Sequence, residues 1–367
     1  MAADTISFAR GAPSLDIVDV DGLKAAAKRA FENDPAGLTG YGTAIGYPPL
    51  RQWIADQHQV EPANVIVTNG SMQADAFLFD HLVAPGDPVV VERPTYDRTL
   101  LGLRQRGADI RPIELEPDGI DVEGVGRLIS DGIRPKLAHV IPNHQNPAGV
   151  TLSAPRRDEL LALAREYRFT VFEDDPYAEI RFRGTPLPSL LSLDSGRDTV
   201  VHASSFTKTV CPGVRVGYLV GSPELIAAIA RRATNLYISP NMVSEGIVYQ
   251  FCVSGDFERS VRTVNIALAE RARRLAAALR EHLPGVRFTE PDGGYFLWVE
   301  LPDDVAVDAV VPAAAERGVA VVKGSDFLLD GGQHALRLAY SAVTAEQVDE
   351  GVRRLAAAIA AVRNQEG

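Results

Sequence analysis

The segment ASSFTKTVCPGVRVGY at 203–218 carries a lysine and an arginine seven residues apart. An apolar run ends in Ser205, Lys208 follows in a loop rich in hydroxyl groups, and a Pro-Gly turn leads to Arg215. A lysine amine can form a Schiff base with a carbonyl group, and an arginine guanidinium matches phosphate oxygens with a planar fork of donors. A lone lysine is usually a solvated surface residue, but this combination favours an amine placed beside a phosphate.

A second apolar run ends in the acidic segment FEDDPY at 172–177. A carboxylate at the end of a buried strand is costly unless a cation or a proton donor meets it. The three-residue step from Asp174 to Tyr177 makes the segment a candidate for a functional site. A helix cap or a solvated acidic turn is an equally good interpretation of this segment alone.

Two further turns offer hydrogen-bond donors. In TNGSMQ at 68–73, a strand ends at Gly70 and a helix begins at Ser71, which leaves unpaired backbone N–H groups for an anion. In IPNHQNPAG at 141–149, Pro147 pushes Asn146 toward an extended conformation and frees its amide to donate. Simple helix capping and a simple Asn-Pro turn are the commoner roles of such segments taken singly.

The polar segments follow β-rich runs that alternate with longer amphipathic runs, a pattern that predicts parallel strands covered by helices. Ligands of open parallel sheets gather at the carboxyl ends of the strands, which is where the four segments lie. The sequence therefore predicts an α/β fold whose strands begin at Asn64, Pro88, Ala108, Lys136, Phe169, Thr199 and Arg215.

The last third of the chain has a different pattern. The segment from Asp256 to about Leu283 lacks internal Gly and Pro, which predicts one long helix that could bridge two domains. Shorter strands and helices after it predict a smaller α+β unit. We expect an N-terminal segment over 1–40 that packs with the small domain, a large domain over 41–265 and a small domain over 266–367.

Composition limits the possible function classes. The chain has 367 residues, of which 46% are hydrophobic and 23% charged, as in ordinary folded proteins. Its formal net charge of -11 argues against nucleic acid and anionic membranes as partners. We expect no signal peptide or membrane span, since no run of 18 apolar residues occurs. Cys211 and Cys252 fit neither a disulfide framework nor a paired metal-ligand spacing, which favours a cytoplasmic protein without a bound metal.

Taken together, the motifs resemble those of the class I/II, fold-type-I aminotransferases, in particular the branch of 2-aminoadipate aminotransferase-like enzymes and the catalytic domains of MocR-type regulators. The resemblance covers nearly the whole chain. It implies a three-layer α/β/α large domain with a mainly parallel seven-stranded sheet, a smaller α+β domain, and pyridoxal 5'-phosphate as the cofactor. The family motif S-x-x-K followed by P-G-x-R-x-G stands here as Ser205, Lys208, Pro212, Gly213, Arg215 and Gly217.

The resemblance implies roles around the cofactor. Lys208 would hold it as a Schiff base and later shuttle the substrate proton. Asp174 would keep the pyridinium nitrogen protonated, which lets the ring accept the electrons released at the substrate Cα. Tyr177 and Asn146 would donate to the ring O3', and Tyr96 would stack on the ring. The phosphate would be bound by Ser71, the N–H group of Met72, Ser205 and Arg215.

Further matches lie in flanking regions of the chain. Arg337 in HALRLAYS would clamp the substrate α-carboxylate, with Gly11 and Asn146 contacting the substrate as well. Tyr41 in GYGTAIGYPPLR would reach the phosphate bound by a neighbouring subunit, which implies a homodimer with shared active sites. Candidates for recognition of the substrate side chain are Arg10, His144 and Tyr237.

The sequence thus predicts an aminotransferase that moves an amino group between an L-amino acid and a 2-oxo acid by a ping-pong mechanism through Lys208. Other reactions of the same cofactor on this fold remain open, namely elimination, decarboxylation and oxygen-consuming oxidation of an amino acid. A cofactor-sensing regulatory module is a further alternative. MocR-type regulators carry an N-terminal winged-helix domain, for which the roughly forty residues ahead of the strand region are too few.

Overall fold

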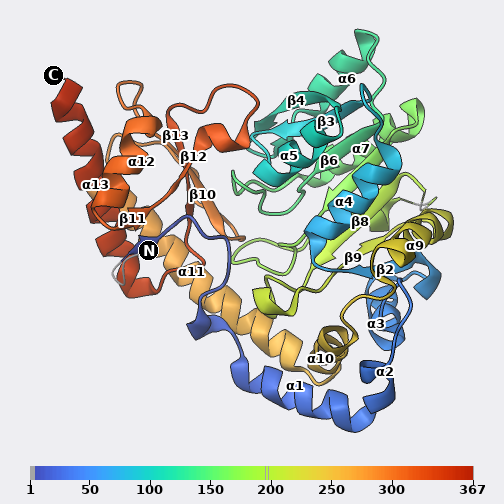
Figure 1. Cartoon of the computed structure of the whole chain (residues 1–367). Coiled ribbons are helices and arrows are strands. Elements are labelled where there is room, and N and C mark those ends of the chain that lie inside the picture. The colour runs from blue at the N-terminus through green and yellow to red at the C-terminus, as the bar shows by residue number, and fades with distance from the viewer. Residues whose placement is uncertain (1–4, 195, 197, 367) are drawn as a thin grey trace.

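The computed structural model describes residues 5–194, 196 and 198–366. Within these residues, the largest element is an eight-stranded sheet with the strand order β2-β9-β8-β7-β6-β3-β4-β5 (Figure 1). Five neighbouring strands from β8 to β4 run parallel, β9 runs antiparallel to both of its neighbours, and β5 pairs antiparallel with β4. The strands are β2 Val65–Thr68, β3 Pro88–Arg93, β4 Asp109–Glu116, β5 Gly119–Ile120, β6 Leu137–Val140, β7 Thr170–Asp174, β8 Val200–Ser205 and β9 Gly217–Val220.

The sheet confirms the seven predicted strands and adds β5. The sequence missed β5 because a strand of two residues has no periodic pattern to detect. The strand expected from Arg215 begins two residues later, at Gly217. Arg215 itself has a left-handed backbone with φ of 52°, which no strand residue adopts.

Helices cover both faces of the sheet, as the predicted three-layer architecture requires. Successive side chains of a strand point to opposite faces, so that Val89 and Val91 pack in one core and Val90 in the other. Helices α4, α5 and α9 cover the first face, and α3, α6, α7, α8 and α10 cover the second. Their bounds are α3 Pro48–His58, α4 Ser71–Leu82, α5 Asp97–Gln105, α6 Val122–Ser130, α7 Ala154–Tyr167, α8 Leu190–Leu193, α9 Pro223–Tyr237 and α10 Met242–Val253.

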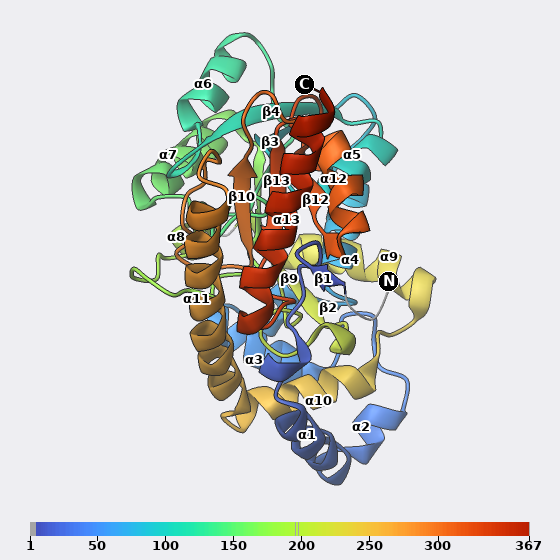
Figure 2. The ribbon, with the colours of Figure 1, turned by 90° about the vertical axis from the view of Figure 1, so that its left-hand side faces the viewer.

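A smaller α+β unit follows in the chain. In its antiparallel sheet β13 lies between β10 and β12, and helices α11, α12 and α13 share one hydrophobic core with these strands. The long predicted helix is confirmed as α11, Asp256–His282, which extends from α10 to the smaller unit (Figures 1 and 2). The other bounds are β10 Phe296–Glu300, α12 Val307–Glu316, β12 Val322–Lys323, β13 Ala335–Ala339 and α13 Ala345–Glu366.

The N-terminal segment contacts both units. Strand β1, Ile6–Ser7, pairs in parallel with β11, Val319–Ala320, and Phe8 is buried in the core of the smaller unit. Helix α1, Val20–Asn33, and helix α2, Pro35–Thr39, pack instead against α10 of the large unit. The domain boundaries after residues 40 and 265 stay predictions. No helix of the described chain has the length and apolar character that crossing a membrane requires.

Candidate active site

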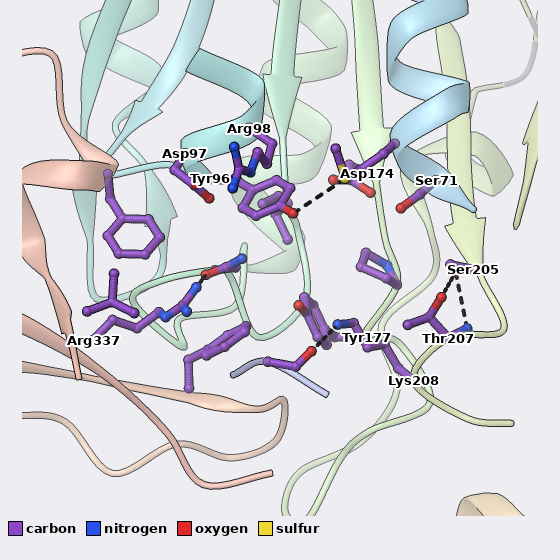
Figure 3. Close-up of a pocket in the computed structure, with 18 of the residues that line it drawn as sticks. Ser71, Tyr96, Asp97, Arg98, Asp174, Tyr177, Ser205, Thr207, Lys208 and Arg337 are labelled. Carbon is purple, nitrogen blue, oxygen red and sulfur yellow. Dashed lines mark hydrogen bonds and ion pairs between the residues drawn. The ribbon is translucent and has the colours of Figure 1, made fainter. Parts of the chain in front are cut away.

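The carboxyl ends of β3, β6, β7 and β8 meet at one edge of the large sheet, where β9 begins because it runs in the opposite direction. A cavity of about 470 Å³ lies at this edge, and Phe296, Phe327 and Arg337 of the smaller unit line it as well. Figure 3 shows Arg337 across the cavity from Ser71. Of the residues predicted to bind the cofactor or the substrate α-carboxylate, all except Tyr41 line the cavity, namely Gly11, Ser71, Met72, Tyr96, Asn146, Asp174, Tyr177, Ser205, Lys208, Arg215 and Arg337.

Lys208 lies in the loop after β8, and its Nζ donates a hydrogen bond to the Gly11 carbonyl oxygen at 2.6 Å. The amine is 5.5 Å from the centre of the Tyr177 ring and 5.1 Å from that of the Tyr295 ring. Aromatic faces attract a cation at these distances. The Tyr295 hydroxyl also donates to the Lys208 carbonyl oxygen at 2.7 Å. Segments from three parts of the chain therefore position this lysine.

The surroundings of Lys208 change its basicity. Burial lowers the pKa of the amine to about 8, and the positive charges of Arg337 and Arg215 act in the same direction, against the opposing charge of Asp174. A lower pKa leaves more of the amine neutral near pH 7. The neutral amine is the form that attacks a carbonyl group or accepts a proton.

Asp174 is the last residue of β7 and is 4% exposed. Its Oδ2 lies 3.7 Å from His139 Nε2, whereas its Oδ1 is buried without a hydrogen-bond partner among the described residues. Burial, with the nearby charge of Asp174, raises the pKa of Asp75 well above its usual value. A buried carboxylate oxygen without a partner calls for a donor from a ligand.

The start of α4 forms an anion cradle. Gly70 has φ of 75°, and a Cβ there would lie 2.5 Å from Arg215 Nη2, so that only glycine fits. A Cβ at Gly217 would lie 2.6 Å from the Ser71 nitrogen. Since no side chain of the described residues caps α4, the N–H groups of Ser71 and Met72 are free to bind an anion together with the Arg215 guanidinium.

Two tyrosines and two hydroxyl residues complete the cofactor side of the cavity. Burial raises the pKa of Tyr96 to about 12 and that of Tyr177 well above its usual value, so that both phenols stay protonated and can donate. The Tyr96 hydroxyl lies 3.9 Å from Met72 Sδ. The Ser205 hydroxyl donates to Thr207 Oγ1 at 2.8 Å. Thr207 lines the cavity although the sequence motif did not single it out.

Arg337 projects from β13 and is 7% exposed. Its Nη1 donates to Asn146 Oδ1 at 3.1 Å and its Nη2 to the Ala9 carbonyl oxygen at 2.7 Å, while its Nε is buried without a partner in the described chain. The guanidinium carbon lies 4.4 Å from the centre of the Phe296 ring and 4.8 Å from that of Phe327. The two rings hold a planar donor fork that has no carboxylate partner among the described residues.

Four predicted residues are not among the described residues that line this cavity. Tyr41 is 90% exposed, and Arg10 is exposed as well. His144 is buried at a φ of 49°, with its ring so close to Gly293 that a Cβ there would lie 2.4 Å from it. Tyr237 donates to the Ala44 carbonyl oxygen. The structure therefore does not place Arg10, His144 or Tyr237 where a substrate side chain would lie in this subunit.

The cavity instead includes charged residues that the sequence reasoning missed. Asp97 and Arg98 follow Tyr96 directly and line the cavity, as does Asp326. The position of Asp97 and Arg98 beside a predicted ring-stacking tyrosine was an available signal. Asp326 had none, since it reaches the cavity only through the packing of the smaller unit against the large one.

The lining fits pyridoxal phosphate. The partnerless oxygen of Asp174 suits a protonated ring nitrogen, and the free N–H groups of α4 with Arg215 suit a phosphate. The desolvated amine of Lys208 suits an aldehyde. These groups share one cavity, and the partnerless donor of Arg337 at its other side suits a substrate carboxylate.

Comparison with known proteins identifies the family. Residues 3–355 match the family described as aminotransferase class I and II. The chain is 31% identical to aromatic-amino-acid aminotransferase 1 of Thermococcus litoralis, with 97% of this chain and 88% of the relative covered. It is 32% identical to the 2-aminoadipate transaminase of Thermus thermophilus, with 96% and 90% covered.

A solved structure shows the same similarity in three dimensions. The alpha-aminoadipate aminotransferase from Thermus thermophilus, complexed with N-(5'-phosphopyridoxyl)-L-leucine, superposes with a TM-score of 0.94 at 30% identity, covering 99% of this chain and 94% of that chain. These similarities confirm the predicted fold type, the aminotransferase activity and pyridoxal phosphate as the cofactor. The chain belongs to the family of class I and II aminotransferases.

Proposed function

We propose that Lys208 carries pyridoxal phosphate and that the enzyme moves an amino group between an L-amino acid and a 2-oxo acid in two half-reactions. One observation carries the proposal, namely that three complementary groups surround a single cavity. They are the desolvated amine of Lys208, the partnerless oxygen of Asp174 and the free N–H groups at Ser71.

Each group would hold one part of the cofactor. Bound pyridoxal phosphate supplies an electron sink for the pair released when the substrate Cα loses its proton. Asp174 Oδ1 would accept a hydrogen bond from the ring nitrogen, and its charge favours the protonated state of that nitrogen. The Asn146 oxygen already accepts from Arg337, so that its NH₂ group is available to donate to the ring O3' beside Tyr177.

Lys208 would also move the substrate proton. Its Nζ would accept the proton from the substrate Cα and return it in the second stage of the half-reaction. A pKa of about 8 suits this role, because a base is most effective when its pKa lies near the working pH.

Arg337 would bind the substrate α-carboxylate. Contacts to Asn146 and Ala9, and the two phenylalanine rings, fix its guanidinium before the substrate arrives. A fixed carboxylate holds the Cα–H bond perpendicular to the cofactor ring, which aligns that bond with the ring's π-system. Loss of the proton is then favoured over loss of the carboxylate or the side chain.

We further propose a homodimer in which Tyr41 reaches the phosphate site of the partner. Tyr41 is 90% exposed between α2 and α3, and Met72, at the phosphate side of the cavity, is 49% exposed. Large exposed apolar groups of this kind favour a protein partner. The unpaired Cys211 and Cys252 support a reducing cytoplasm as the compartment. Sedimentation would test the dimer, and a monomer with normal cofactor affinity would contradict it.

A spectral half-reaction tests the catalytic proposal. The purified enzyme with pyridoxal phosphate is mixed with single amino acids, and the visible absorbance of the lysine-bound cofactor and the 2-oxo acid formed are both measured. We expect bleaching with formation of one equivalent of oxo acid, and recovery of the absorbance when a second 2-oxo acid is added. Release of ammonia or carbon dioxide, or uptake of oxygen, would contradict amino transfer.

A matched pair of variants tests the role of Lys208. Lys208→Ala is expected to abolish the lysine-bound absorbance and to slow amino transfer by more than about a thousandfold. Lys136→Ala removes an exposed lysine outside the cavity and should leave both properties unchanged. Normal turnover of the Lys208 variant would refute the assignment.

A further inference from the structure

The charged residues that line the cavity divide into three groups. Seven charged side chains line it, and the proposed function uses four of them. Asp174, Lys208 and Arg215 serve the cofactor, and Arg337 serves the substrate α-carboxylate. The remaining three are Asp97, Arg98 and Asp326, which nothing in the cofactor or carboxylate chemistry requires.

Asp97 and Asp326 come from two segments that are joined next to Arg337. The Thr95 N–H group donates to the Phe327 carbonyl oxygen at 3.0 Å, which ties the start of α5 to the loop of the smaller unit. The Phe327 ring stacks on the Arg337 guanidinium. Figure 3 shows Asp97 and Arg98 at the edge of the cavity opposite Lys208. The two acids are therefore neighbours of the carboxylate clamp, and we call them the acidic wall.

The acidic wall has more negative charge than its own partners neutralise. Arg98 Nε lies 3.4 Å from Asp97 Oδ2, which balances that carboxylate. The one ion-pair partner of Asp326 among the described residues is Lys323, whose Nζ is 4.0 Å away and lies closer to Asp308, at 3.4 Å. One carboxylate thus faces the cavity with little compensation. Burial raises the pKa of Asp326, and the charges of Asp97 and Asp308 raise it further, against the opposing charges of Lys323 and Arg337.

The cavity also contains two buried polar atoms that would need a hydrogen bond from a ligand. Arg337 Nε and Asp174 Oδ1 are both buried without a partner among the described residues. A substrate carboxylate on Arg337 would cancel the positive charge nearest to the acidic wall. Once that carboxylate is bound, the net negative charge of the acidic wall faces the side chain of the substrate.

We propose that the enzyme prefers an amino acid whose side chain ends in a cationic group, an ammonium or a guanidinium, and that Asp97 and Asp326 receive this group. The inference rests on the proposed function, since it takes Arg337 as the carboxylate clamp. A second carboxylate on the substrate would stand beside two acids, and the cation next to it would be the half-exposed Arg98, whose charge already balances Asp97. An apolar side chain would bury Asp326 without a donor.

Binding of unreactive analogues tests the inference without turnover. Three carboxylates without an α-amino group are titrated into the enzyme loaded with pyridoxal phosphate: 4-guanidinobutanoate, glutarate and pentanoate. We expect 4-guanidinobutanoate to bind about tenfold more tightly than either of the others, as one charge-assisted hydrogen bond provides. Tighter binding of glutarate would assign recognition to Arg98 and overturn the proposal, and tighter binding of pentanoate would overturn it as well.

Two substitutions test which carboxylate causes the preference for the guanidinium analogue. Asp326→Asn should remove the tenfold preference, whereas Asp308→Asn, which changes the other acidic neighbour of Lys323 outside the cavity, should retain it. The half-reaction with lysine, arginine, leucine and glutamate should rank the basic donors first. If no donor converts the cofactor, the amino-transfer proposal fails while the analogue titration still decides this inference. An equal loss in both variants would contradict a role for the acidic wall.

Discussion

Replacement of Lys208 by methionine is expected to stabilise the cofactor-free protein at pH 7. Burial lowers the pKa of the amine from 10.5 to about 8. The charged form of the buried amine therefore destabilises the folded state by about 3 kcal/mol at pH 7, given about 1.4 kcal/mol for each tenfold change in proton affinity. Loss of the hydrogen bond to the Gly11 carbonyl oxygen offsets about 1 kcal/mol. We expect a net gain of about 2 kcal/mol.

The pH dependence makes this prediction specific. Between pH 8 and pH 10.5 the unfolded amine binds more protons than the folded one, so that the free energy of unfolding of the natural protein rises with pH across this window. Lys208→Met lacks the amine, so its stability advantage over the natural protein should shrink from pH 8 upward and fall to about 0 kcal/mol near pH 10. Urea unfolding of the two cofactor-free proteins from pH 7 to pH 10 measures the difference.

Other titratable groups contribute equally to the free energy of unfolding of the natural protein and of Lys208→Met, so their contributions cancel when the two are subtracted. Lys136→Met, at an exposed position, serves as the control and should differ from the natural protein by a constant amount over the same range. A constant difference for Lys208→Met as well would refute the reasoning, because it would mean that the amine is as well solvated in the folded state as in the unfolded one.

Three further substitutions have distinct expected results. Arg337→Lys keeps the charge but loses the planar fork, so kcat/KM for the amino donor should fall about a hundredfold while the absorbance of the bound cofactor stays unchanged; a cofactor defect would argue against a carboxylate clamp. Asp174→Asn should lower kcat by about a hundredfold or more, since a neutral amide no longer favours a protonated ring nitrogen; stopped-flow spectra would measure this, and an unchanged kcat would contradict the pairing. Tyr295→Phe removes the hydroxyl that donates to the Lys208 carbonyl oxygen and should reduce the free energy of unfolding by about 1 kcal/mol; calorimetry would detect the loss, and an unchanged stability would show that the bond contributes nothing.

The sequence alone predicted the large sheet and most of the cofactor side of the cavity. Apolar runs that end in polar residues mark strand ends, and parallel strands bring those ends to one edge, so Asp174, Asn146 and Lys208 could be grouped without coordinates. Gly70 is required by its own backbone, with φ of 75°, whereas Gly217 is required because the backbone of Ser71 lies too close for a Cβ there.

The substrate side of the cavity is formed by contacts between segments that are distant in sequence. Such contacts leave no local sequence pattern from which they could be predicted. Tyr295 donates to the carbonyl oxygen of Lys208 across 87 positions of sequence. Arg337 is held between the ring of Phe296, in β10, and that of Phe327, which ends a short 3-10 helix. The candidates chosen from sequence were polar residues near a motif, and one of them, His144, turned out to pack against Gly293. Asp326 reaches the cavity only because the smaller unit closes over the sheet edge.

Reduction with borohydride tests the central claim most directly, because it converts the bond between the cofactor and its lysine into a stable secondary amine. The chain has four lysines besides Lys208, so that peptide mapping by mass spectrometry can distinguish them. We predict that the reduced phosphopyridoxyl group is found on Lys208. Its recovery on Lys136, Lys323 or another lysine, or a stoichiometric cofactor that borohydride does not fix to the chain, would contradict the assignment of this cavity as the active site.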